Sequence, residues 1–548
     1  MSMKRVILLL IAVLSVTLCS NTKTEQIRPT KNVIVLLSDG TSTSLLSASR
    51  WYKYYCGEEH KLNIDSHVCG LIKTYLFDAP IAGSAGAMSA LMTGVLHDNP
   101  SISTYPQVNH KDDLLLSKID SSRAFQPLMT VAEAMKVQQN KAIGLVSTVD
   151  FYHATPSACF AHSANRNEHF ALMCQLASQS LDVMIAGGAK MITKEVKEIL
   201  KEQEITYIEK DFNAFRNHKE GKLWALLANR NTSYELDRQK EEPSLAEMTD
   251  KAIKLLSKNK KGFFLMVEGS KVDMAAHAND AKATITEFLA FDEAVKVAID
   301  FARNNKNTTV LILADHGTSG ITLGDREYKN YSDKGLDSMF VNLHKFKCTS
   351  IALAPKIKRC KSLEEISYVF KEYTNIQLTQ EESQTLFDIK DLQEGNYMSV
   401  SSSNNLLSSI NRILNNYHHI GFTSGNHTGE DVFLAVYHPK GHKPSGIISN
   451  IEFNNYLCSV AGIKSSLEEL TDFYYARHSE LLHGINFSII SNIKTPTLSF
   501  THNNKRVLIR AWDSKVIIDD KKVQLSTPVV YMKENNIFYI SKELLEKL

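Results

Sequence analysis

Three acidic residues follow or end short apolar runs, and carboxylates in such positions can bind metal ions. Asp39 follows the run NVIVLLS, Glu268 ends the run FFLMV, and Asp315 follows TTVLILA. In an open α/β sheet, the ligand site lies beyond the carboxyl ends of the strands. Each acid alone fits a helix cap or a surface loop, but three acids that converge there would repel one another strongly unless cations neutralised them. Together with nearby histidines, the pattern predicts a site for several metal ions.

Three further motifs offer imidazole ligands. Asp273 and His277 stand four residues apart, so both can face one metal from a single helical turn; an ordinary surface turn is the alternative. The adjacent pair Asp315 and His316 ends a strand run, where both side chains can reach one ion, although a turn with a satisfied histidine also fits. His427 lies in a glycine-rich turn before a strand, where a lone histidine is more often incidental. The metal hypothesis therefore depends on the combination of motifs.

Two residues are suited to a phosphate group. Ser84, in IAGSAGAMSALMTGV, stands at the start of a predicted helix, where a serine is usually a cap. A helix start also offers free backbone N–H groups and a positive dipole, which favour a bound phosphate. Arg166, in FYHATPSACFAHSANRNE, has a planar fork of donors that matches two phosphate oxygens. Either residue alone is weak support, and both gain weight beside metal ligands.

Six ordered motifs in residues 30–460 resemble those of the bacterial alkaline phosphatase family, which is a far more specific signal than any single motif. The motifs are SDG at Asp39, GSAGAMSALMTGV at Ser84, HATPSA with a later NR at Arg166, VEGSKVD with a later histidine at His277, ADHGTSG at Asp315, and NHTGED at His427.

The resemblance implies hydrolysis of phosphate monoesters through a phosphoserine intermediate. Ser84 would be the nucleophile and Arg166 would bind the phosphate. The cofactors would be two zinc ions and one magnesium ion. The implied ligands form three sets: Asp273, His277 and His427 for the first zinc; Asp39, Asp315 and His316 for the second; and Asp39, Thr155 and Glu268 for magnesium.

At three positions the sequence departs from many relatives. Gly83 stands where an aspartate often helps to orient the arginine, so we expect Arg166 to be held less firmly. His153 stands near the magnesium position, where some relatives have an aspartate, and would make that site more tolerant of zinc. Met274 replaces a lysine or histidine that often helps to hold phosphate, which predicts lower affinity or faster product release.

Other functions remain open at this point. Relatives use the same metal scaffold on phosphodiesters, so a phosphodiesterase is the enzymatic alternative. Gly83 and Met274 are the support for a non-catalytic protein that binds phosphate or metal. A solute-binding lipoprotein would explain the N-terminus but not the acids at the strand ends. The net charge of +2 gives no indication of a nucleic-acid partner.

Strands and helices alternate along the chain. Ser244 with Glu247 predicts a capping box at one helix start, and Thr284 with Glu287 predicts the start of another. The alternation predicts a layered α/β fold, and the resemblance implies a three-layer sandwich with a large, mostly parallel sheet, commonly in a homodimer. The runs that predict buried parallel strands are residues 32–38, 142–147, 263–267, 308–314 and 432–437.

Two segments differ in character from the rest of the chain. Residues from about 319 to 420 are polar, lysine-rich and partly helical, which predicts a cap-like insertion beside the site. The tail, residues 495–548, has short alternating runs and a final helical run, which predicts a small C-terminal module. This tail resembles the domain shared with the N-terminal region of copper amine oxidases. No ligand cluster for copper occurs in it.

The N-terminus predicts export. Lys4 and Arg5 precede an apolar run, residues 6–14, that is too short to span a bilayer comfortably, and small or polar residues follow. Residues 1–19 are therefore expected to be an export signal that sends the protein to the periplasm or cell surface. Cys19 is a candidate for lipidation, but Leu18 before it fits that signal poorly, so simple secretion is equally open.

Of the eight cysteines, seven remain without Cys19. In an oxidising compartment some should pair, and proximity along the chain suggests two candidate pairs. Small buried hydrophobic side chains are the alternative interpretation. The candidate pairs are Cys348 with Cys360 and Cys159 with Cys174.

Overall fold

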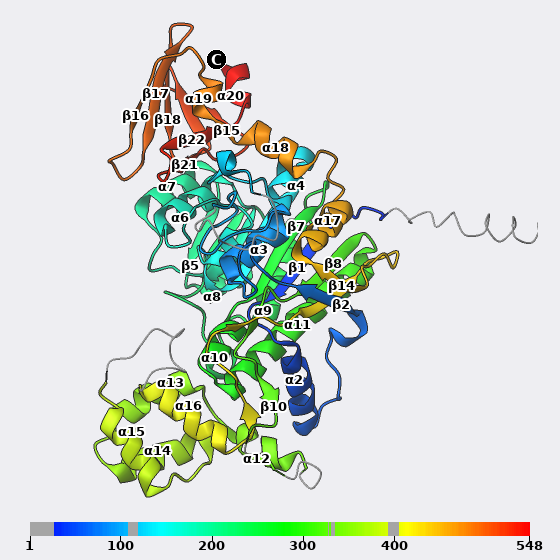
Figure 1. Cartoon of the computed structure of the whole chain (residues 1–548), viewed down its shortest axis with the longest axis vertical. Coiled ribbons are helices and arrows are strands. Elements are labelled where there is room, and N and C mark those ends of the chain that lie inside the picture. The colour runs from blue at the N-terminus through cyan, green and yellow to red at the C-terminus, as the bar shows by residue number, and fades with distance from the viewer. Residues whose placement is uncertain (1–26, 108–118, 327, 330–334, 393–404) are drawn as a thin grey trace, which may run out of the picture.

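The computed structural model describes residues 27–107, 119–326, 328, 329, 335–392 and 405–548 (Figure 1). The predicted export signal and Cys19 lie outside these residues. A ten-stranded sheet has the order β14-β2-β13-β8-β1-β7-β3-β4-β6-β5. Its strands are β1 (Asn32–Ser38), β2 (Val68–Lys73), β3 (Ala142–Asp150), β4 (Val183–Gly187), β5 (Thr206–Glu209), β6 (Leu223–Leu226), β7 (Phe263–Gly269), β8 (Thr308–Leu313), β13 (Val432–Tyr437) and β14 (Gly446–Ser449).

The sheet is mostly parallel, as predicted, with one exception among the predicted strands. Strands β8, β1, β7, β3, β4, β6 and β5 run parallel to one another. Strand β13 is antiparallel to both β8 and β2, so its predicted parallel direction is wrong. Its apolar run reflects burial between helix layers, and burial of both faces carries no information about direction.

Two groups of helices cover the sheet, which confirms the three-layer α/β/α architecture. In the first group, two helices pack on β3, β7 and β8 and the third packs on one of those helices; in the second group, two helices pack on β1, β2 and β3 and the third packs on both of them. The first group is α2 (Thr43–Tyr55), α9 (Leu245–Leu256) and α11 (Ala281–Asn305). The second group is α3 (Ser84–Thr93), α4 (Val131–Gln139) and α17 (Asn450–Ala461).

The helix starts were predicted correctly for α9 and incorrectly for α11. The Ser244 side chain accepts a hydrogen bond from the backbone N–H of Glu247 at 3.2 Å, but the Glu247 carboxylate pairs with Arg216 and does not complete the capping box. Helix α11 begins at Ala281 with Asp280 as its cap. Thr284 therefore lies inside the helix, where its hydroxyl donates to the Asp280 carbonyl at 2.7 Å.

The predicted insertion forms a helical lobe at the bottom of Figure 1. Its helices pack mainly on one another. The Asn411 side chain donates to the Ala278 carbonyl at 2.7 Å, and the Ser350 backbone N–H donates to the Asp280 carboxylate at 2.7 Å. The lobe is thus attached to the turn that follows His277. Its helices are α12 (Asp337–Lys345), α13 (Ser350–Lys358), α14 (Leu363–Thr374), α15 (Gln380–Ile389) and α16 (Leu406–Asn416).

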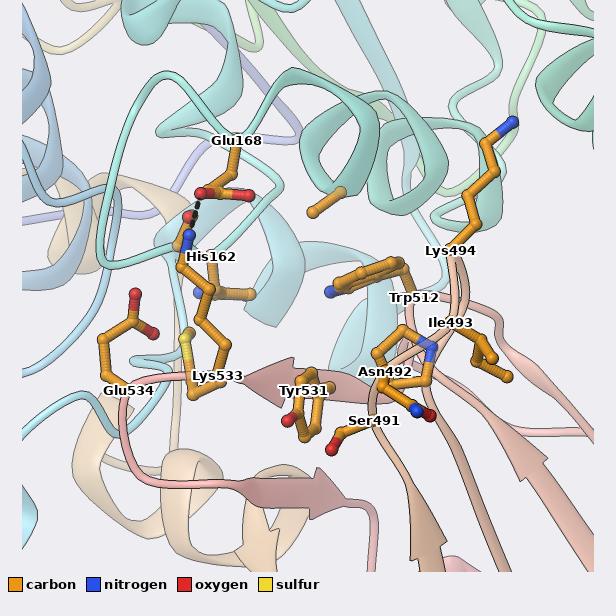
Figure 2. Close-up of a pocket in the computed structure, with 14 residues that line it drawn as sticks. His162, Glu168, Ser491, Asn492, Ile493, Lys494, Trp512, Tyr531, Lys533 and Glu534 are labelled. Atoms are coloured by element: carbon orange, nitrogen blue, oxygen red, sulfur yellow. Dashed lines mark hydrogen bonds and ion pairs between the residues drawn. The ribbon is translucent and has the colours of Figure 1, made fainter.

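The C-terminal module is defined as residues 475–548, which include the predicted segment 495–548 and lie at the top of Figure 1 as short strands and a final helix. Strands β16 to β20 form an antiparallel sheet, and β15, β22 and β21 form a second. The turn between β21 and β22 carries Lys533, which pairs with Glu168 of the domain that contains the ten-stranded sheet (Figure 2). The elements are β15 (Ala476–Arg477), β16 (Phe487–Ile490), β17 (Thr497–His502), β18 (Lys505–Arg510), β19 (Lys515–Ile518), β20 (Lys521–Gln524), β21 (Val530–Met532), β22 (Ile537–Ile540) and α20 (Glu543–Lys547).

The cysteines of the described residues are all free thiols, so neither candidate disulfide forms. Cys159, Cys174, Cys348 and Cys360 are buried, which confirms the interpretation of small hydrophobic side chains. In the part of the chain that the structure describes, no helix combines the length and the hydropathy needed to cross a bilayer.

Candidate active site

The three predicted acids meet at one edge of the sheet because their strands are neighbours. Leu37 of β1 is in register with Leu313 of β8 and with Glu268 of β7, so all three strands end at the same level. Asp39, Glu268 and Asp315 are fully buried. One oxygen of each carboxylate has no hydrogen-bond partner in the described structure. Buried acceptors without donors fit bound cations.

Burial and mutual repulsion raise the pKa values of these acids. Burial, reinforced by Asp315 and Asp273, raises the pKa of Asp39 well above its usual value. Burial raises the pKa of Asp315 to about 8 and the pKa of Glu268 to about 7. Divalent cations would favour the ionised carboxylates, so the donor set is one that metal binding would stabilise.

Two groups of side chains have metal-ligand spacing, with ligand atoms within 4.8 Å of one another. Asp39, Asp315 and His316 form one group, which is the set implied for the second zinc. Asp273, His316 and His427 form the other. The set implied for the first zinc has His277 where this group has His316. His277 lies beside the group, with its Nε2 atom 3.4 Å from the Asp273 carboxylate.

The histidines are oriented by backbone carbonyls. The Nδ1 atom of His427 lies 2.9 Å from the Ala82 carbonyl, and Nδ1 of His277 lies 2.6 Å from the Gly425 carbonyl. In both residues Nε2 is then directed at Asp273. A carbonyl partner on the second ring nitrogen is the usual support of a metal-binding histidine.

The protonation of this group is set by burial and by charge. Burial lowers the pKa of His427 and, together with His427, the pKa of His316, which favours neutral rings that can bind metal. Burial alone would lower the pKa of His277, but Asp273 raises it. Burial alone would raise the pKa of Asp273, but His277 and His427 lower it.

Gly40 explains how two of the ligand segments approach each other. Its φ angle is +64°, a conformation that favours glycine. A Cβ atom at this position would lie 2.4 Å from Oδ1 of Asp273. The absent side chain therefore lets the turn after Asp39 pack directly against the helix that carries Asp273, α10 (Lys271–His277).

Thr155 joins the acids at the Glu268 side of the site. Its hydroxyl donates to Asp39 at 3.4 Å. The Ser147 hydroxyl donates to the second oxygen of Glu268 at 2.8 Å, and the Thr318 hydroxyl donates to Asp273 at 2.6 Å. Sequence reasoning missed Ser147 and Thr318, although Ser147 ends the predicted run AIGLVS.

Ser84 is the first residue of α3, and its Oγ atom lies 3.2 Å from Nε2 of His316. Since His316 belongs to both ligand groups, the serine hydroxyl lies beside them. The residues before it are also fixed, because the Ala82 carbonyl is the partner of His427. The first backbone N–H groups of a helix have no intrahelical acceptor, so this position suits an anion.

Arg166 reaches the same site from the segment after β3. The guanidinium Nη2 lies 3.3 Å from Nε2 of His153. Its charge is close enough to lower the pKa of Asp39 and of His427. Burial and Arg166 lower the pKa of His153 to about 3, so this histidine is neutral and accepts from the arginine. His153 lies in neither ligand group among the described residues.

Comparisons with known proteins identify the family of the chain. A family model described as alkaline phosphatase matches residues 30–463. Alkaline phosphatase 4 of Bacillus subtilis (strain 168) is 32% identical over 448 residues, which cover 78% of this chain and 88% of that protein. Alkaline phosphatase 3 of the same strain is 32% identical over 440 residues, 77% of this chain and 87% of that protein.

Solved structures show the same fold. The cold-active alkaline phosphatase from the psychrophile Shewanella sp. has a TM-score of 0.67 and 22% identity, with 78% of this chain and 99% of that chain covered. The alkaline phosphatase of Thermus thermophilus has the same TM-score and identity, with 82% and 97% covered. The matched family model spans the stretch in which the six motifs occur, and the chain belongs to the alkaline phosphatase family.

Proposed function

We propose that the protein hydrolyses phosphate monoesters, with Ser84 as the nucleophile and Arg166 as the phosphate-binding residue. The observation that carries this proposal is the 3.2 Å contact between the Ser84 hydroxyl, at a helix start, and His316, which is common to both ligand groups. The Bacillus subtilis relatives that are 32% identical are alkaline phosphatases, which supports the same activity here.

The cofactors in this proposal are two zinc ions and one magnesium ion. Nitrogen and carboxylate donors suit zinc, and an all-oxygen set suits magnesium. When bound, such ions would lower the pKa of the serine hydroxyl and neutralise charge on the phosphate group. The zinc ligands would be Asp39, Asp273, His277, Asp315, His316 and His427, and the magnesium ligands Asp39, Thr155 and Glu268.

The chain's own groups account for binding and bond exchange. Arg166 donates to two oxygens of the phosphoryl group, and His153 fixes the guanidinium by accepting from it. The Ser84 oxygen forms a bond to phosphorus as the bond to the leaving alcohol breaks, which gives a phosphoserine. Water then attacks the phosphorus, inorganic phosphate leaves, and the Ser84 hydroxyl is restored.

The test compares a monoester and a diester of the same nitrophenol. We expect faster hydrolysis of the monoester, and loss of at least about 10³-fold in turnover for Ser84→Ala with zinc content unchanged. The serine variant separates the nucleophile from the metal ligands because its side chain is not in either ligand set. Full activity of Ser84→Ala, or a preference for the diester, would contradict the proposal.

Export is proposed for this enzyme on the basis of its N-terminal residues 1–19. Cell fractionation should place the activity in the periplasm or at the cell surface. Cys19→Ser would release the protein from the membrane fraction if the cysteine carries a lipid, and would change nothing after simple secretion. We also propose a homodimer, which light scattering of the purified protein would test.

A further inference from the structure

Gly83, the residue directly before the nucleophile, has no conformational reason to be glycine. Its φ and ψ angles are −108° and 162°, an extended conformation that any residue adopts. The reason lies in its surroundings. A Cβ atom at this position would be 3.0 Å from Nδ2 and 3.2 Å from Oδ1 of Asn99. The Asn99 amide therefore occupies the space that a side chain at position 83 would need.

The segment that carries Asn99 connects the nucleophile with the phosphate-binding arginine. The Asp98 carbonyl packs against the first turn of α3, since a Cβ atom at Gly86 would lie 3.0 Å from it. Two residues later, the Pro100 carbonyl accepts from the backbone N–H of Arg166 at 3.0 Å. Asn99 stands between these two contacts along the chain, and its side-chain amide lies beside Gly83, the residue that precedes Ser84.

Asn99 is also exposed, so a substrate can reach it. A primary amide offers two N–H donors and carries no charge. A phosphoryl group that is attacked by Ser84 and held by Arg166 has to lie between those residues. Because its oxygens are charged acceptors, a neutral donor beside them strengthens binding, whereas a carboxylate at the same place would repel them.

We propose that Asn99 is a substrate-binding residue of this phosphatase, whose side-chain amide donates a hydrogen bond to an oxygen of the phosphoryl group, and that Gly83 is glycine to make room for that amide. This inference rests on the proposed function, with Ser84 as nucleophile. It also gives the glycine before the nucleophile a role, because an aspartate at position 83 would displace the Asn99 amide from its place beside Ser84.

The test uses Asn99→Ala, Asn99→Asp and, as a control at an exposed position in the C-terminal module, Asn492→Ala. For Asn99→Ala, we expect kcat/KM for 4-nitrophenyl phosphate to fall about 10- to 100-fold and the Kd of inorganic phosphate to rise by a similar factor. Asn99→Asp should bind phosphate still more weakly, because its carboxylate repels the phosphate oxygens. The control should match the native protein, and all variants should keep the native Tm and zinc content.

A double-mutant cycle tests the pairing with Gly83. Gly83→Ala alone should displace the amide and lower kcat/KM, but in the Asn99→Ala background the same change should have little effect. Additive effects, or native phosphate affinity in Asn99→Ala, would overturn the inference. The proposed function is judged separately by the native protein and Ser84→Ala, so an inactive Ser84→Ala beside a fully active Asn99→Ala would refute only the role of Asn99.

Discussion

At the scale of single residues, the site is a cluster of buried acids, and the stability of the fold around them depends on pH and on bound cations. The pKa of Asp315, about 8, and that of Glu268, about 7, exceed the ordinary values of 3.8 and 4.5. At pH values between the ordinary and the raised pKa values, the folded, metal-free protein binds more protons than the unfolded chain does. Its free energy of unfolding should therefore fall as the pH rises from about 4 to about 8.

We expect chelator-treated protein to show a lower Tm at about pH 8 than at about pH 5, and saturating zinc and magnesium to remove or reverse this difference. The cations stabilise the ionised carboxylates. Without cations, ionisation of these buried groups destabilises the folded protein. Asp315→Asn should flatten the pH dependence of the metal-free protein because the amide does not titrate. A Tm of the metal-free protein that rises over this pH range would show that these acids ionise freely.

A second residue-scale prediction concerns His153. Its neutral ring accepts from Arg166, so it is expected to orient the guanidinium during turnover. His153→Ala should raise the KM for the monoester by about 3- to 30-fold with zinc content unchanged, since one hydrogen bond to a charged group is lost. Loss of zinc from this variant, measured by mass spectrometry, would instead place His153 among the metal ligands.

At the scale of elements, sequence reasoning succeeded where local pattern decides the structure. Apolar runs located β1, β7 and β8, and their shared edge explains why Asp39, Glu268 and Asp315 meet. Sequence reasoning failed where contacts with distant parts of the chain decide the structure. Helix α11 starts at Ala281 because one oxygen of the Asp280 carboxylate caps the helix and the other accepts from Ser350 in the insertion. No pattern near residue 281 reports that second contact.

The ligand groups show the same limit. His316 and His277 were both identified from their motifs, but the side-chain directions that place His316 in two groups depend on the backbone turn after β8 and on neighbouring carbonyls. Strand β13 was located correctly and its direction was not, because a strand buried on both faces has the same composition in either orientation.

The turn after β1 supports a prediction at this scale. Gly40→Ala should strain a left-handed residue by about 1 kcal/mol and also push Asp273, so we expect at least about a 100-fold loss of kcat/KM and weaker zinc binding. Gly57→Ala is the matched control, since Gly57 has a φ angle of +86° but no atom within 4 Å of the added Cβ. Equal activity of the two variants would mean that the contact with Asp273 is unimportant.

At the scale of the whole molecule, the C-terminal module is joined to the catalytic domain by a buried polar network and by peripheral ion pairs. The Tyr475 hydroxyl donates to Glu133 at 2.7 Å and lies 2.9 Å from Nε2 of His162. The same histidine borders a cavity of about 380 Å³ between the module and the catalytic domain (Figure 2). Arg166 follows four residues after His162, so the network with Tyr475 lies close in sequence to the residue proposed to bind phosphate.

Because this network is buried, the two parts should unfold together, and Tyr475 should contribute most to that coupling. Tyr475→Phe leaves the Glu133 carboxylate with one donor fewer, so the free energy of unfolding in urea should fall by about 1–3 kcal/mol. Tyr474→Phe, at the half-buried neighbouring tyrosine, should change it little. The native protein should show coincident transitions by circular dichroism and by the part of its tryptophan fluorescence that the Trp512→Phe variant lacks. Separate transitions in the native protein, or equal effects of the two variants, would mean that the module folds independently of the catalytic domain.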